Sequence, residues 1–166
     1  MKRAFRFTQR GGGILCHPTS LPGRHGIGDL GDASREFVDW LAAAGLGWWQ
    51  MLPINPAGPG DSPYCALSAF AGNPLLVSLD ELVADGLLDA RDVQPARGVR
   101  AERVNFGAVT RYKTARLRKA CDAFVAGGGL KSRAFREFCA REAAWLGDHA
   151  LYVALRGTHG DQEWGK

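Results

Sequence analysis

Two short apolar runs near the start of the chain predict buried β-strands. The first is Ile14-Leu15-Cys16, which follows three glycines and ends before a proline. The second is Trp48-Trp49-Gln50-Met51-Leu52, which also ends at a proline. Neither run alternates apolar with polar residues, and continuous apolar runs are typical of parallel strands that are covered on both faces.

A helix is predicted between these two strands. Asp32 is the expected N-cap, and Gly45 stands where a left-handed residue commonly ends a helix. A strand, a helix of about 12 residues and a second strand form a βαβ unit, whose two strands run parallel. The apolar residues between the caps recur on one helical face, and they are Phe37, Val38, Trp40, Leu41 and Ala44.

The remaining sequence predicts one long loop and then helices only. Residues 55–74 are rich in proline and glycine and exceed the usual length of a connection within a compact domain, which is typical of functional loops. Residues 89–102 are polar and irregular. Four helices are expected in this second half, and their N-caps are Ser78, Asn105, Ser132 and Asp148.

Such a small parallel sheet predicts partner strands that this chain does not supply. Two or three parallel strands neither close a sheet nor cover a core, and the helical second half adds none. The 166 residues therefore fit either a small domain or a piece of a larger one. We expect the fold class to be α/β, with an incomplete sheet.

Composition and charge exclude several classes of protein. Hydrophobic residues make up 46% and charged residues 23%, which is too apolar for a disordered chain. The net charge is only +4, and basic residues alternate with acidic ones, so we expect no nucleic-acid partner. No apolar run reaches the ~18–20 residues that cross a bilayer, so we expect no membrane partner.

The cysteines and the N-terminus favour a cytoplasmic location. Residues 1–10 are basic and lack the continuous apolar core of a secretory signal, so we interpret them as an arm. The cysteines form no CxxC pair and fit no common zinc spacing, so we interpret them as buried free thiols and expect neither metal nor cofactor. The four cysteines are Cys16, Cys65, Cys121 and Cys139.

Candidate chemistry gathers on the two loops that follow the predicted strands. Ligands of α/β folds bind at the carboxyl ends of parallel strands, which is where both loops begin. Tyr64 offers a flat apolar face and a hydroxyl, as a pyranose ring requires, and flanking prolines stiffen its loop. The donors and acceptors that suit sugar hydroxyls are His17, Asp61, Ser68 and Asn73.

The same residues also have a purely structural interpretation. Asp61 can cap a turn, Asn73 can form an Asx turn before its proline, and His17 can be a buried, hydrogen-bonded histidine. The stretch Gly26 to Gly31 matches GxGxxG formally, but it begins about ten residues after its strand, so we do not expect dinucleotide binding. Composition alone leaves the sugar-binding and structural interpretations open.

Three segments resemble the N-terminal part of the 4-α-glucanotransferases, also called amylomaltases or disproportionating enzymes, of glycoside hydrolase family 77. They are HPTSLPGRHGIGDLG at 17–31, WWQMLPINPAGPGDSPY at 48–64 and SAFAGNPLLVSLDEL at 68–82. Weaker similarity in order and spacing continues into the helical half. The resemblance thus covers almost the whole chain and favours the sugar-binding interpretation of the loops.

The resemblance implies a (β/α)8 barrel with helical insertions, of which this chain is the N-terminal part. Residues 11–79 would hold the first strands and the substrate-cleft loops, and residues 80–166 a helical insertion subdomain. It also implies transfer of α-1,4-glucan segments between maltodextrins with retention of configuration, which needs two carboxyl groups ~5–5.5 Å apart.

The resemblance places those two carboxyl groups on later strands, outside this chain. Asp29, Asp61 and Glu81 do not match the catalytic motifs, so we expect no catalytic residue here and at most weak glucan binding by the chain alone. Tyr64 matches the tyrosine that stacks beside the cleaved glucose. Asp61, Ser68 and Asn73 match positions around the same cleft, and His17 stands in the first matching segment.

Overall fold

The structure is a computed structural model that describes residues 10–95 and 103–159. The predicted arm at 1–10 therefore lies outside the described residues except for Arg10, and residues 96–102 of the polar stretch lie outside them as well. The strands are β1 (Gly13–Leu15) and β2 (Trp48–Gln50), and the helices are α1 (Asp32–Ala43), α2 (Leu79–Ala84), α3 (Phe106–Ala126), α4 (Arg133–Arg141) and α5 (Leu146–His159).

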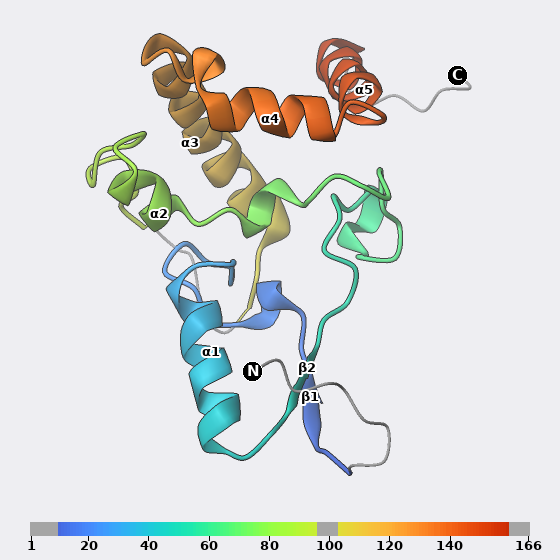
Figure 1. The fold of residues 1–166 in the computed structure, drawn as a ribbon. Coiled ribbons are helices and arrows are strands. Elements are labelled where there is room, and N and C mark those ends of the chain that lie inside the picture. Colours follow the sequence, from blue (N-terminus) through green and yellow to red (C-terminus); the bar gives the residue numbers. More distant parts are fainter. Residues whose placement is uncertain (1–9, 96–102, 160–166) are drawn as a thin grey trace.

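The βαβ prediction is confirmed, because β1 and β2 pair in parallel with Ile14 opposite Trp49. Helix α1 runs back alongside the pair (Figure 1) and covers one of its faces. The ring of Phe37 on α1 meets the ring of Trp49 edge-on, with centroids 4.9 Å apart. The indole Nε1 of Trp49 donates to the carbonyl oxygen of Cys16 at 2.7 Å, which ties the end of one strand to the other.

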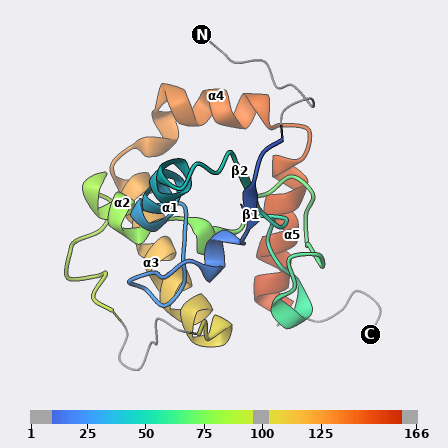
Figure 2. The ribbon, with the colours of Figure 1, turned by 90° about the horizontal axis from the view of Figure 1, so that it is seen from below.

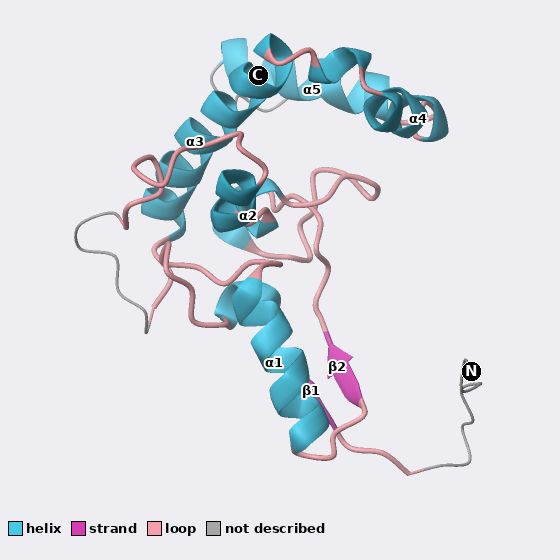
Figure 3. Ribbon diagram, turned by 60° about the vertical axis from the view of Figure 1, so that its left-hand side comes forward, coloured by secondary structure: helices cyan, strands magenta, loops and turns pink. Residues whose placement is uncertain are grey.

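The hydrophobic core lies in the helical half, between α2 and α3. Its buried members are Leu79, Leu88, Val93, Tyr112 and Ala120, and side chains of α2 and α3 complete it. Ser78, Asn105 and Ser132 each accept a hydrogen bond from a backbone N–H of the first turn of α2, α3 and α4, so all three predicted caps are confirmed. Figures 1 and 3 show α3, α4 and α5 gathered at the end of the molecule away from β1 and β2.

The caps of α1 and α5 differ from the prediction. Asp32 is the first residue of α1 and Gly31 is its N-cap, because the chain enters the helix one residue earlier than the side chains suggest. Helix α5 begins at Leu146, not at Asp148, and continues past Gly157 to His159. The amide of His149 donates to the carbonyl of Trp145, so Asp148 lies inside the first turn of α5 and not before it.

Both predictions of burial at the strands and cysteines need correction. Leu15 is 60% exposed and Trp48 is 52% exposed, so the face of the sheet turned away from α1 is open. Viewed from below (Figure 2), β1 and β2 form a single isolated pair among the described residues. The cysteines are free, but Cys65 on the long loop and Cys121 on α3 are exposed and not buried as predicted.

Candidate functional site

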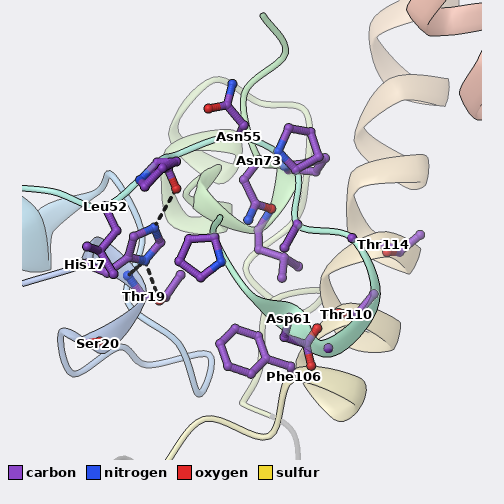
Figure 4. Close-up of a pocket in the computed structure, with 18 of the residues that line it drawn as sticks. His17, Thr19, Ser20, Leu52, Asn55, Asp61, Asn73, Phe106, Thr110 and Thr114 are labelled. Atoms are coloured by element: carbon purple, nitrogen blue, oxygen red, sulfur yellow. Dashed lines mark hydrogen bonds between the residues drawn. The ribbon is translucent and has the colours of Figure 1, made fainter. Parts of the chain in front are cut away.

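A pocket of about 640 Å³ lies where the two loops after the strands face the first turns of α3. Figure 4 shows His17, Thr19 and Leu52 at one end of it, Thr110 and Thr114 of α3 at the other, and Asn73 between them. The predicted site residues His17, Asp61 and Asn73 all line this pocket. Segments far apart in the sequence therefore build one concave site at the carboxyl ends of β1 and β2.

His17 joins the two loops through both of its ring nitrogens. Nδ1 accepts from the backbone N–H of Thr19 at 3.3 Å and lies 2.7 Å from the Thr19 hydroxyl, while Nε2 lies 3.2 Å from the Pro53 carbonyl oxygen. A carbonyl can only accept, so Nε2 is the donor in the contact with Pro53. His17 thus caps the short 3-10 turn Pro18–Ser20 and fixes the wall of the pocket.

The long loop is held together by its own backbone. Residues Ala57 and Ala66 form an antiparallel bridge, and the amide of Leu67 donates to the carbonyl of Pro56 at 2.9 Å. Asn55 closes the base of the loop, because its Nδ2 donates to the carbonyl of Ala71 at 3.0 Å. The loop is therefore an ordered unit on the end of β2.

Asn73 forms the turn that the structural interpretation predicts, and Ser68 forms a second local turn that it did not predict. The side-chain oxygen of Asn73 accepts from the amide of Leu75 at 2.9 Å and caps the 3-10 turn Pro74–Leu76. The hydroxyl of Ser68 accepts from the amides of Phe70 and Ala71. Asn73 keeps its Nδ2 donors for the pocket that it lines, whereas Ser68 lies outside that lining.

Asp61 is the predicted site residue with the most unusual backbone. Its φ of 55° is the one positive φ of a non-glycine residue in the described part of the chain. An L-residue adopts this left-handed conformation at a cost, and such strain is commonly found at functional sites. The Asp61 carboxylate lines the pocket and has no hydrogen-bond partner among the described residues, so it is available to a ligand.

Tyr64 stands apart from the pocket. Its side chain is 72% exposed, and the loop presents it to solvent beyond the pocket lining. The Ser62 hydroxyl accepts from the Tyr64 amide at 3.3 Å and orders the backbone there. The structure therefore brings His17, Asp61 and Asn73 together and leaves Tyr64 and Ser68 on the outer part of the same loop.

The helical side of the pocket was missed by the sequence analysis. Phe106, Thr110 and Thr114 line it from α3, and Arg156 lines it from α5. The three α3 residues are four positions apart, so they form one helical face that the spacing alone could have revealed. Their side chains are chemically ordinary, and only the packing of α3 against the loops turns that face toward the pocket.

Two buried ionisable groups lie behind the pocket wall. The ammonium of Lys113 lies 3.0 Å from Asp29, and burial lowers the Lys113 pKa although the Asp29 charge opposes this. The imidazole of His25 lies 3.0 Å from Asp80, and burial lowers the His25 pKa against the hydrogen bond to that carboxylate. The Lys113–Asp29 pair connects α3 to the loop that follows β1, and the His25–Asp80 pair connects α2 to the same loop.

Comparisons with known proteins assign the chain to a protein family. The family model described as 4-alpha-glucanotransferase matches residues 16–166. The chain belongs to the 4-alpha-glucanotransferase family. Residue identity with the 4-alpha-glucanotransferase of Thermus thermophilus is 43% over 155 residues, which are 93% of this chain and 30% of that protein. The chloroplastic/amyloplastic 4-alpha-glucanotransferase DPE1 of Arabidopsis thaliana is 41% identical over 160 residues, 95% of this chain and 27% of its own length.

A solved structure supports the same assignment. The amylomaltase from Streptococcus agalactiae in complex with acarbose matches with a TM-score of 0.83 and 33% identity, over 95% of this chain and 32% of that one. The chain of this family member thus spans about 30% of the length of the curated relatives that it matches. The resemblance seen in the three sequence segments is confirmed.

The described residues contain no group of three or more His, Cys, Asp or Glu side chains that could hold a metal ion. Among the helices of residues 10–95 and 103–159, none has the length and apolar character that a membrane span requires.

Proposed function

We propose that this chain is the N-terminal part of an enzyme that transfers α-1,4-glucan segments between maltodextrins. The observation that supports the proposal is the pocket at the strand ends, whose lining includes the unpaired Asp61 carboxylate, the amide of Asn73 and the hydroxyls of Thr110 and Thr114. Sugar hydroxyls need such mixed donors and acceptors. The match to an amylomaltase in complex with acarbose supports a glucan as the ligand.

The open face of the β1–β2 pair supports a place in a larger (β/α)8 barrel. Parallel strands are normally covered on both faces, and a two-stranded sheet has no independent stability. Leu15 and Trp48 are exposed at this face, and later strands of a barrel would cover them. In this proposal residues 11–79 hold the first barrel strands and cleft loops, and residues 80–166 are a helical insertion.

The proposed reaction retains anomeric configuration through a covalent glycosyl-enzyme. Retention needs a nucleophilic carboxylate and an acid/base carboxyl ~5–5.5 Å apart, and we assign neither to this chain. Asp29 is bound to Lys113 and Glu81 to Arg35, so both carboxylates already have partners away from the pocket. The chain alone is accordingly expected to bind glucan weakly and to transfer nothing.

Each site residue has a proposed role in binding. Asp61 and Asn73 would accept from and donate to sugar hydroxyls inside the pocket, and the Tyr64 ring would stack on a glucose unit outside it. Ser68 would shape the loop that carries them. His17 would hold the two loops in place and would not bind the sugar itself, since both of its ring nitrogens already have partners.

We also propose a cytoplasmic location and no nucleic-acid or membrane partner. The four cysteines lie within the described residues and are all free, which suits a reducing compartment.

The proposal is tested by a chimera in which residues 16–159 replace the matching segment of the Thermus thermophilus relative. Incubated with maltotriose, the chimera should release glucose and form longer oligosaccharides. The 166-residue chain alone, at the same concentration, should release none. A folded chimera without transfer activity would contradict the assignment of this segment, and transfer by the isolated chain would contradict its proposed inactivity.

The role of the pocket is tested by Asp61→Asn, since asparagine also tolerates a positive φ. This variant should fold normally and bind acarbose more weakly than the parent chimera.

A further inference from the structure

The Lys113 ammonium lies in a wholly buried position between three segments of the chain. The side chain is 0% exposed, although lysine is rarely found buried unless it is paired. Its Nζ donates to Oδ2 of Asp29 at 3.0 Å and to the carbonyl oxygen of Leu75 at 2.8 Å. One charged group from α3 therefore holds both the loop after β1 and the turn at the end of the long loop.

Both partners of Lys113 lead directly to the pocket wall. Leu75 lines the pocket itself, and its amide donates to the side chain of Asn73, which also lines it. Thr114, the residue after Lys113, lines the pocket from α3. The bond from Lys113 to the Leu75 carbonyl thus joins the α3 wall to the Asn73 wall from behind.

Asp29 carries the connection to the third wall. Its Oδ1 accepts from the amide of Gly31, and the amide of Leu30 donates to the carbonyl of Leu76 at 3.0 Å. The amide of Gly28 donates to the carbonyl of Thr19, a pocket-lining residue. The loop from 17 to 31 is therefore anchored at the same ammonium as the other two walls.

The energetics argue against a role in stability alone. Removing two charges from water is costly, and a buried ion pair can often be replaced by apolar residues without loss of stability. Burial also lowers the pKa of Lys113, so the charged form is held at a cost. An ammonium, unlike a methyl group, fixes the direction of two oxygen acceptors at once.

We propose that Lys113 is a positioning residue of the glucan pocket, which sets the separation of its α3 wall from the Asn73 turn and the loop after β1. This inference rests on the proposed function of the pocket. It predicts that loss of the ammonium loosens the three walls relative to one another while α4 and α5 remain as they are.

The first experiment measures amide hydrogen exchange by NMR in the 166-residue chain. Lys113→Met keeps the length of the side chain and removes its donors. Exchange of the amides of Leu30, Leu75 and Leu76 should accelerate at least about tenfold, with little change in the amides of α4. Equal acceleration of all amides, or none at the three named ones, would overturn the proposal.

Lys119→Met is the matched control on the same helix. Lys119 is bound to Asp92 at 2.6 Å, but it is exposed and is not among the residues that line the pocket, so its loss should leave the three amides unchanged. If Lys113→Met does not fold, the double variant Asp29→Leu with Lys113→Met removes both charges. This double variant should restore the unfolding midpoint yet still show fast exchange at Leu75 and Leu76.

A second measurement in the chimera separates this inference from the proposed function. Lys113→Met should raise KM for maltotriose severalfold with a smaller effect on kcat, because the pocket binds and other residues react. An unchanged KM would overturn the positioning role. A parent chimera without activity would instead contradict the proposed function, and the exchange experiment would still decide whether Lys113 positions the walls.

Discussion

The Nε2 atom of His25 lies 3.0 Å from the Oδ2 atom of Asp80, on an imidazole that is 2% exposed. His25 belongs to the loop after β1 and Asp80 to the first turn of α2, so the contact links the pocket loop to the helical core. The ring of Tyr112 on α3 stacks against the His25 ring with centroids 5.9 Å apart. A single histidine therefore joins three elements.

This contact predicts that stability falls in mild acid. Burial lowers the His25 pKa below 6.5, and the nearby Lys113 charge lowers it further, while Asp80 and Asp29 act in the opposite direction. As the pH falls through 6.5, the unfolded chain takes up this proton before the folded chain does, so the free energy of unfolding decreases. Between pH 7 and pH 5, urea unfolding of the wild type should show this decrease.

His25→Gln should flatten that pH dependence, because it removes the titrating group while keeping a polar side chain. His159→Gln is the control, since His159 is exposed at the end of α5. A His25→Gln variant with the wild-type slope would show that another group is responsible.

The N-cap of α3 predicts a second measurable effect. The Asn105 side chain accepts from the amide of Ala108 at 3.0 Å, one turn before the pocket residue Thr110. Asn105→Ala should lower the free energy of unfolding by about 1 kcal/mol, whereas Asn105→Ser should retain most of it. Equal urea midpoints for the two variants would mean that the side chain does not cap the helix in solution.

The sequence predicted what depends on neighbouring residues and missed what depends on packing. Three caps, the parallel pairing of β1 with β2 and the position of the loops followed from local spacing. The α3 wall of the pocket did not, because Phe106, Thr110 and Thr114 face it only after α3 docks on the loops. The open strands were predicted as buried, because a continuous apolar run is typical of a parallel strand covered on both faces, whereas β1 and β2 form an isolated pair among the described residues.

The same distinction explains why the ion pair between Lys113 and Asp29 was not predicted from the sequence. Eighty-four residues separate them, and neither neighbourhood in the sequence suggests a buried charge. Asp29 lies in the glycine-rich stretch 26–31, and its partner Lys113 is visible only in three dimensions. Long-range ion pairs of this kind have no local pattern from which a single sequence could predict them.

The proposed stacking role of Tyr64 predicts a contribution to glucan binding from outside the pocket. Its ring is exposed on a loop that backbone bonds already hold in place, so stacking costs little ordering. In the active chimera Tyr64→Ala should weaken sugar binding by roughly 1–3 kcal/mol, by analogy with aromatic truncations at other binding sites. Tyr64→Phe keeps the ring and should retain most of the affinity, as measured from KM and acarbose inhibition.

Unchanged inhibition by acarbose in Tyr64→Ala would contradict the stacking role. Equal losses in both Tyr64 variants would instead assign the interaction to the hydroxyl.

The lack of space for a side chain at Gly28 predicts that the loop after β1 does not tolerate alanine there. A Cβ atom built on Gly28 would overlap the carbonyl oxygen of Pro18 and lie 2.6 Å from that of Leu21, both of them backbone atoms that cannot rotate away. Gly28→Ala should therefore cost about 3 kcal/mol of unfolding free energy. Gly47→Ala is the matched control, because a Cβ there meets no heavy atom within 4 Å.

The Gly28 variant should also disturb the pocket more than its loss of stability implies. The amide of Gly28 donates to the carbonyl of Thr19, so a displaced loop moves the turn that His17 caps. NMR shifts of Thr19 and Ser20 should change in Gly28→Ala and remain constant in Gly47→Ala. A Gly28→Ala chain as stable as the wild type, with both shifts unchanged, would mean that the loop packs less tightly in solution than this close approach requires.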